Sequence, residues 1–127
     1  MLILFSGGMT RGTQKALIDG NYKLTLKAER FSLTDTPTVK LDGDNDGTGG
    51  DDYAFGSDIN DKFFALYGDI DGDRDVDGMD NFVFRASYGK NPGQAGYNIA
   101  FDYNGGGVID GIDNFFFRQR YGKSLGF

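Results

Sequence analysis

Residues 69–80 read Asp69-Ile-Asp-Gly-Asp-Arg-Asp-Val-Asp-Gly-Met-Asp80, and this acidic stretch is the strongest structural signal in the chain. Its six aspartates stand at every second or third position. A backbone that folds back on itself at this spacing points oxygen ligands at one hard cation. Without a cation the like charges repel one another, so we expect the stretch to be ordered only when it is loaded.

The stretch, called loop 1 below, resembles the twelve-residue calcium loop of EF-hand proteins. Ligands in that loop come from positions 1, 3, 5, 7, 9 and 12, and position 7 uses its backbone carbonyl. Position 8, here Val76, is expected to reach the core and pair with a sister loop. The predicted ligands are Asp69, Asp71, Asp73, the carbonyl of Asp75, Asp77 and Asp80. A solvated turn is the alternative, because aspartate and glycine are also common turn residues.

An internal repeat supports the calcium interpretation. Residues 80–90 and 113–123 are identical at eight of eleven positions, with an offset of 33. The same offset defines loop 2, residues 102–113, with predicted ligands Asp102, Asn104, the carbonyl of Val108, Asp110 and Asp113. Gly106 stands at position 5 and offers no side-chain oxygen, so we expect weaker binding in loop 2. Arg74 stands at position 6, where glycine normally provides a positive φ.

A helix is predicted after each loop, ending near Gly89 or Gly122. The aromatic side chains of these helices are expected to form a core shared by the two helices. They are Phe82, Tyr88, Phe115 and Tyr121. An entering helix is predicted over residues 59–67, with its cap at Asn60 or Asp61.

The first half of the chain is predicted to be β-rich. Apolar and polar residues alternate over 22–28, which is typical of a half-buried strand, and shorter strands are predicted at 2–6, 16–18 and 39–41. A third candidate cation site has the start of a calcium loop, with Asp42, Asp44 and Asp46. Either Asp51 or Asp52 could complete it, and a solvated turn is the alternative.

Composition narrows the classes of function. The 127 residues include neither cysteine nor histidine, which excludes Cys/His zinc sites, thiol nucleophiles and imidazole bases. The net charge of −6, without a basic stripe, argues against nucleic acid and anionic membranes as partners. The apolar run at residues 2–5 is too short for a signal peptide or a membrane span. We therefore expect either an intracellular chain or, preferably, a piece of a longer secreted protein, because millimolar extracellular calcium suits weak loops.

At residues 69–88 and 102–121 the sequence resembles dockerin modules, which carry two calcium loops, each followed by a helix. Asp80 and Asp113 at position 12 also match dockerin loops. Residues 19–26 and 41–47 resemble the last strands of bacterial Ig-like surface domains. These resemblances imply an α+β chain, with incomplete Ig-like strands in residues 1–57 followed by an all-α dockerin-like pair of loop–helix repeats in 58–127. The repeats span 69–90 and 102–123.

The dockerin resemblance implies a monomeric, non-catalytic module that binds two calcium ions, or three with the additional site. Such a module docks onto a cohesin-like domain and tethers its parent, often a polysaccharide-degrading enzyme, to an assembly or cell surface. The partner-binding positions carried over by the resemblance are Gly78, Met79, Arg85, Gly111, Ile112 and Arg118. The two arginines could equally be ordinary solvated helix residues.

Two other functions compete with docking. Paired aspartates can perform glycosidase acid–base chemistry, but here each one is committed to a ligand position. The chain could also be a structural tail of a surface protein, rigidified by calcium and without a cohesin partner. That alternative shares every calcium prediction with the docking module.

Overall fold

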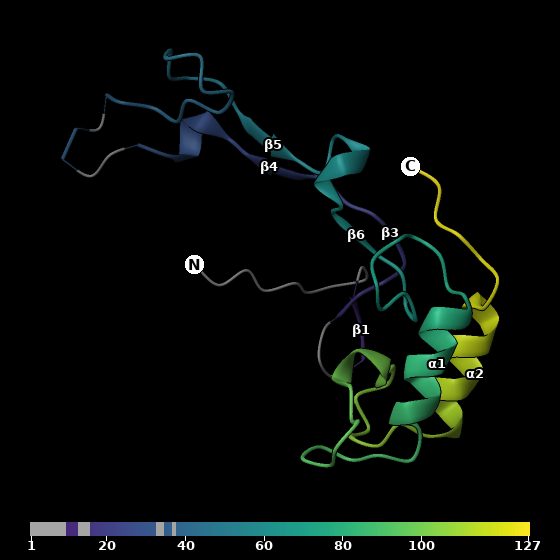
Figure 1. Ribbon diagram of the computed structural model, residues 1–127. Coiled ribbons are helices and arrows are strands. Elements are labelled where there is room, and N and C mark those ends of the chain that lie inside the picture. Colours follow the sequence, from purple (N-terminus) through teal and green to yellow (C-terminus); the bar gives the residue numbers. More distant parts are fainter. Residues whose placement is uncertain (1–9, 13–15, 33–34, 37) are drawn as a thin grey trace. The chain divides into compact units, whose positions relative to one another are not determined.

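A computed structural model describes residues 10–12, 16–32, 35–36 and 38–127 (Figure 1). The strand predicted at residues 2–6 lies outside this part. The chain divides into two compact units, one built from Met1–Gly20 with Ala65–Phe127 and the other from Asn21–Phe64. The domains expected at residues 1–57 and 58–127 stay a prediction, because compactness does not test independent folding.

The two α-helices of the first unit begin in the same way. Helix α1 spans Gly78–Ser87 and α2 spans Gly111–Arg120. Asp77 and Asp110 are their N-caps, and each forms a capping box with the aspartate three residues later. The predicted ends are confirmed, because Gly89 and Gly122 follow the last helical turns with φ of 75° and 77°.

Phe84 and Phe117 hold the two helices together. Their rings stack with centroids 4.3 Å apart, and both side chains are buried. The prediction that this core is formed by Phe82, Tyr88, Phe115 and Tyr121 is wrong, since these side chains are 74%, 48%, 58% and 51% exposed. Phe82 and Phe115 each lie two residues before the buried phenylalanine of their helix. Two residues along an α-helix correspond to a rotation of about 200°, so their side chains face away from the core.

The same core contains Tyr67 and Phe101 as well as Val76 and Ile109, the last two fully buried. Neither pairs with its sister loop, which corrects the expectation for position 8. Val76 accepts a hydrogen bond from the Gly122 amide (2.7 Å) and donates to the Lys123 carbonyl (3.0 Å). Ile109 likewise accepts from Gly89 and donates to Lys90. Each loop is therefore bonded to the chain that leaves the other repeat, which gives the unit a pseudo-two-fold arrangement.

The prediction that residues 58–127 are all-α is wrong. Described residues contain two α-helices, small antiparallel ladders and single-turn 3-10 helices such as η3, Ile99–Phe101. The expected helix at 59–67 is replaced by the 3-10 turn η2, Ile59–Asp61, and strand β6, Phe64–Ala65. Asp58 caps η2, and Lys62 ends it with a left-handed φ of 49°, so the helix does not continue.

Two short strands precede the repeats in the first unit. β1, Thr10–Arg11, pairs antiparallel with β2, Ala16–Leu17, in the register Thr10 to Leu17. Asp19 follows this hairpin, and β3 spans Gly20–Asn21. None of the helices in the described part is long and apolar enough to cross a membrane.

The second unit contains one three-residue ladder. β4, Leu24–Leu26, pairs antiparallel with β5, Tyr53–Phe55. This confirms the centre of the strand predicted at 22–28, which ends where the 3-10 turn η1, Ala28–Arg30, begins. The strand expected at 39–41 is reduced to a single bridge between Ser32 and Lys40.

Candidate metal centre

Two carboxylates fold loop 1 back on itself. Asp69 accepts hydrogen bonds from the amides of Gly72 (2.6 Å) and Arg74 (3.0 Å). Asp80, fully buried, accepts from the amides of Ile70 (2.7 Å) and Asp77 (2.8 Å). A carboxylate has about four lone-pair sites, so each of these side chains retains acceptor capacity for a cation.

The acidic side chains of loop 1 gather into two groups that could hold a metal ion. Within each group the oxygen atoms lie within 4.8 Å of one another. One group contains Asp69, Asp71 and Asp73, and the other contains Asp75, Asp77 and Asp80. The six predicted residues of this loop are therefore divided between two groups of three, and Asp69 and Asp80 belong to different groups. Asp75 joins through its carboxylate, whereas the sequence predicted only its backbone carbonyl as a ligand.

The charges of loop 1 perturb one another. Partial burial raises the pKa of Asp69, and the nearby charges of Asp80 and Asp73 raise it further. The pKa of Asp71 and the pKa of Asp75 are raised by desolvation and then by neighbouring aspartates. A bound cation would remove this repulsion, which fits a donor set made for a hard, oxygen-seeking metal.

Loop 2 repeats the same backbone frame 33 residues later. Asp102 accepts from the amides of Gly106 and Gly107, each at 2.9 Å. Asp113, fully buried, accepts from the amides of Tyr103 (2.8 Å) and Asp110 (2.7 Å). Burial, followed by the charges of Asp102 and Asp110, raises the pKa of Asp113.

Loop 2 nevertheless has fewer charged donors. Asn104 stands in place of a carboxylate and accepts a hydrogen bond from the Gly106 amide (2.8 Å). Val108, the predicted carbonyl ligand, is partly exposed. The acidic groups found among the described residues do not include loop 2. A cation in loop 2 would therefore depend on carbonyl, amide and water oxygens more than a cation in loop 1.

The third candidate site is completed by Asp51. Its oxygen lies in one group with those of Asp42, Asp44 and Asp46. Asp51 accepts from the Gly43 amide (2.7 Å) and the Asp44 amide (2.9 Å). Asp52, the other predicted candidate, instead forms a 2.6 Å ion pair with Lys27. This site belongs to the second unit.

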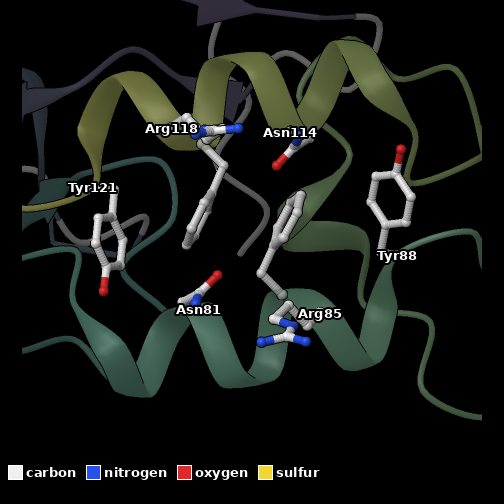
Figure 2. A pocket seen from close by; sticks show the side chains of 8 residues that line it. Asn81, Arg85, Tyr88, Asn114, Arg118 and Tyr121 are labelled. Carbon is white, nitrogen blue, oxygen red and sulfur yellow. The ribbon is translucent and has the colours of Figure 1, made fainter.

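A groove lies between α1 and α2, with a volume of about 630 Å³. The order of the labelled side chains along the two helices shows that they run antiparallel (Figure 2). The groove is lined by Asn81, Phe84, Arg85, Tyr88, Asn114, Phe117, Arg118 and Tyr121. Three residues of each helix and the tyrosine that caps its C-terminal end contribute, at positions related by the 33-residue offset.

The groove contains two of the six predicted partner-binding residues, Arg85 and Arg118. The other four are exposed at the starts of the helices, and they are Gly78, Met79, Gly111 and Ile112. The sequence reasoning did not assign a role to Asn81 and its repeat mate Asn114. Their identity in both repeats was the available signal.

No protein-family model, curated protein or solved structure matches the chain. The dockerin and Ig-like resemblances therefore stay predictions that rest on the motifs.

Proposed function

We propose that this chain is a calcium-binding, non-catalytic docking module of the dockerin type. In this proposal it tethers a larger extracellular bacterial protein to a cohesin-like domain. The loops bind Ca²⁺, and the face formed by α1 and α2 meets the partner. Millimolar calcium outside cells would suffice for loops of moderate affinity.

The observation that carries the proposal is the repeated carboxylate frame. Asp69 and Asp102, at position 1, each accept two amides of their own loop. Asp80 and Asp113, at position 12, each accept two more and are fully buried. Buried carboxylates are costly unless they are compensated, and a divalent cation supplies that compensation. The ion pairs Lys27–Asp52, Arg30–Glu29 and Arg120–Asp19 lie outside both loops.

The docking part of the proposal is supported by the groove between α1 and α2. Its charged side chains are Arg85 and Arg118, in a protein with a net charge of −6. Exposed Met79 (63%) and Ile112 (50%) provide apolar surface at the starts of the helices. Aromatic, arginine and methionine side chains are enriched at protein interfaces. A partner with carboxylates near an apolar patch would complement this surface.

The calcium part is tested by adding Ca²⁺ to protein that has been freed of metal with a chelator, while amide NMR spectra are recorded. Mg²⁺ is the control. We expect the amides of residues 69–123 to shift and to become more dispersed with Ca²⁺, most strongly in the two loops, because the cation offsets the repulsion within them. The double variant Asp69→Ala with Asp80→Ala should lose this response. A spectrum that is already dispersed in chelator and does not move with Ca²⁺ would show that the loops are turns.

The docking part is tested separately, by binding to a panel of cohesin domains in Ca²⁺. We expect binding that is lost in chelator and weakened by the double variant Arg85→Ala with Arg118→Ala. Lys62→Ala is the matched control, because it removes a cation from the other unit. Calcium binding without any cohesin binding would favour the structural tail.

A further inference from the structure

Arg11 of the β1–β2 pair contacts loop 2. The Arg11 guanidinium lies 4.7 Å from the ring centroid of Tyr103 and 4.7 Å from that of Tyr67. Its Nη1 donates to the Tyr103 carbonyl at 3.5 Å. Tyr103 is position 2 of loop 2, between the predicted ligands Asp102 and Asn104, so the contact reaches the backbone that carries them.

Gly12 brings its backbone against the same segment of loop 2. A Cβ at this position would stand 2.8 Å from the Tyr103 carbonyl oxygen and 3.4 Å from the Asn104 carbonyl carbon. Gly12 also has a φ of 64°. Only glycine fits this combination of close approach and left-handed backbone without a shift of one segment.

Asp19 fixes the other end of this segment. Its carboxylate forms a 2.7 Å ion pair with Arg120 Nε and accepts the Tyr67 amide at 2.9 Å. Both charged side chains of the pair are mostly buried. Tyr103 stacks on Phe116, with ring centroids 3.8 Å apart. The contacts therefore tie Arg11 and Gly12 to loop 2, and Asp19 to Tyr67 and α2.

Loop 1 is supported by a different part of the chain. The Leu125 amide donates to the Arg74 carbonyl at 2.7 Å, and Asp75 forms a β-bridge with Ser124. The Arg74 guanidinium lies 5.5 Å from the Phe127 ring centroid. Each loop thus contacts a segment outside the repeats, the C-terminal residues for loop 1 and the β1–β2 hairpin for loop 2.

We propose that the β1–β2 hairpin is a positioning element for the second cation site, with Arg11 and Gly12 holding positions 2 and 3 of loop 2 in their binding conformation. This inference rests on the proposed function of loop 2 as a calcium site. Loop 2 has fewer carboxylates than loop 1, so less binding free energy is available to order it. If loop 2 is already ordered before the cation binds, less of the binding free energy is spent on ordering it, since the conformational entropy has been lost beforehand.

The test is a calcium titration of the full chain and its Gly12→Ala variant, followed by amide NMR. The amides of Gly106 and Gly107 report on loop 2, and those of Gly72 and Arg74 report on loop 1. We expect Gly12→Ala to weaken calcium binding in loop 2 about tenfold or more and to leave loop 1 within about twofold, as for a lost outer contact of a metal ligand.

Two further variants separate positioning from general folding. Arg11→Met removes the guanidinium but keeps a long side chain. Like Gly12→Ala, it should lower the calcium affinity of loop 2. Phe127→Ala is the mirror control, because its contact lies on loop 1. In chelator, hydrogen exchange at the Gly106 and Gly107 amides should accelerate in Gly12→Ala relative to wild type, a readout that does not require calcium.

The outcomes distinguish this inference from the proposed function. If wild type binds calcium at both loops and Gly12→Ala changes neither the binding nor the exchange, the positioning role is wrong while the calcium function stands. Equal weakening of both loops would also overturn it, because the hairpin would then be a general folding element. If wild type shows no calcium binding in loop 2, the proposed function of that loop fails and the inference fails with it.

Discussion

The two repeats share a backbone frame and differ in their charge. In both, the aspartate at position 12 accepts the amides of positions 2 and 9, the aspartate at position 1 accepts the amide of position 6, and the residue at position 8 is fully buried. The second amide accepted at position 1 differs, being Gly72 at position 4 in loop 1 and Gly106 at position 5 in loop 2. Loop 1 carries Asp71 and Asp73 at positions 3 and 5, where loop 2 carries Asn104 and Gly106. The frame therefore does not depend on the number of carboxylates. Positions 3 and 5 can vary the affinity for a cation without changing the fold.

Removal of the position 12 carboxylates should have the largest effect. Asp80→Ala and Asp113→Ala each leave two loop amides without their acceptor, at a cost of about 2–4 kcal/mol of unfolding free energy. In saturating Ca²⁺ Asp80→Ala should cost more, because it also weakens the loop with more carboxylates. Denaturant unfolding followed by circular dichroism measures both.

Asp80→Asn and Asp113→Asn are the matched controls. Each keeps one oxygen acceptor and a nearly unchanged volume, so the loss should be smaller. If Asp113→Ala costs more than Asp80→Ala in Ca²⁺, loop 2 would be the stronger site and the comparison would be reversed.

Exchanging position 5 between the loops should reverse their affinities. Asp73→Gly is expected to weaken loop 1 about tenfold, and Gly106→Asp to strengthen loop 2 by a similar factor, or about 1.4 kcal/mol each. A Cβ on Gly106 would stand 2.8 Å from Asn104 Oδ1, the end of a side chain that can rotate away. Calorimetric titration with Ca²⁺ measures both constants.

The variant Gly106→Asn controls for charge, because it adds an oxygen without a carboxylate. Its gain should be smaller than that of Gly106→Asp. Equal gains would mean that ligand number, and not charge, separates the two loops.

Position 6 offers a third comparison. Arg74 and Gly107 have nearly the same backbone, with φ of 79° and 81°. Gly107→Ala should destabilise the protein by about 1 kcal/mol, since a side chain is strained at this φ. Arg74→Gly should stabilise by less than that, because glycine also gains entropy in the unfolded chain. Thermal unfolding in Ca²⁺ compares the stabilities of the two variants. A large loss of stability in Arg74→Gly would indicate that the contact of Arg74 with Phe127 outweighs the backbone strain.

Local patterns in the sequence predicted the loops and their helices well. The helices after both loops and the glycines that end them were predicted correctly. The ligand roles of the aspartates at positions 1 and 12 stay a prediction. These features depend on residues close together in the chain. The pairing of Val76 with Gly122 and Lys123 was not predictable in this way, because it depends on how the two repeats pack.

The wrong predictions concern features that the periodicity of apolar residues does not determine. Residues 59–67 have helical spacing of apolar side chains, but the capped turn at Asp58 and the left-handed Lys62 divert the chain. The exposed Phe82 was predicted to be buried, because composition alone does not say which of two phenylalanines faces α2. The contact of Arg11 with Tyr103 joins residues 92 apart, and periodicity gives no signal for it.

The smallest expected effect is the pH dependence of the cation-free protein. The pKa of Asp69 and the pKa of Asp113 are raised above the ordinary value of 3.8, chiefly by burial. The folded state then binds protons more tightly than the unfolded state, so in chelator the unfolding free energy should rise as pH falls from 7 through the raised pKa values. The gain is complete below 3.8, and we expect less than about 1 kcal/mol per group.

In saturating Ca²⁺ the sign should reverse over the same pH range, because protons compete with the cation for the carboxylates. Unfolding measured in chelator and in Ca²⁺ from pH 7 to pH 4 compares the two conditions. Loop 1 should respond more strongly than loop 2, since the pKa values of Asp71 and Asp75 are raised as well. If both conditions lose stability with falling pH, the loop carboxylates are stabilised by hydrogen bonds alone, and the repulsion that separates loop 1 from loop 2 is negligible.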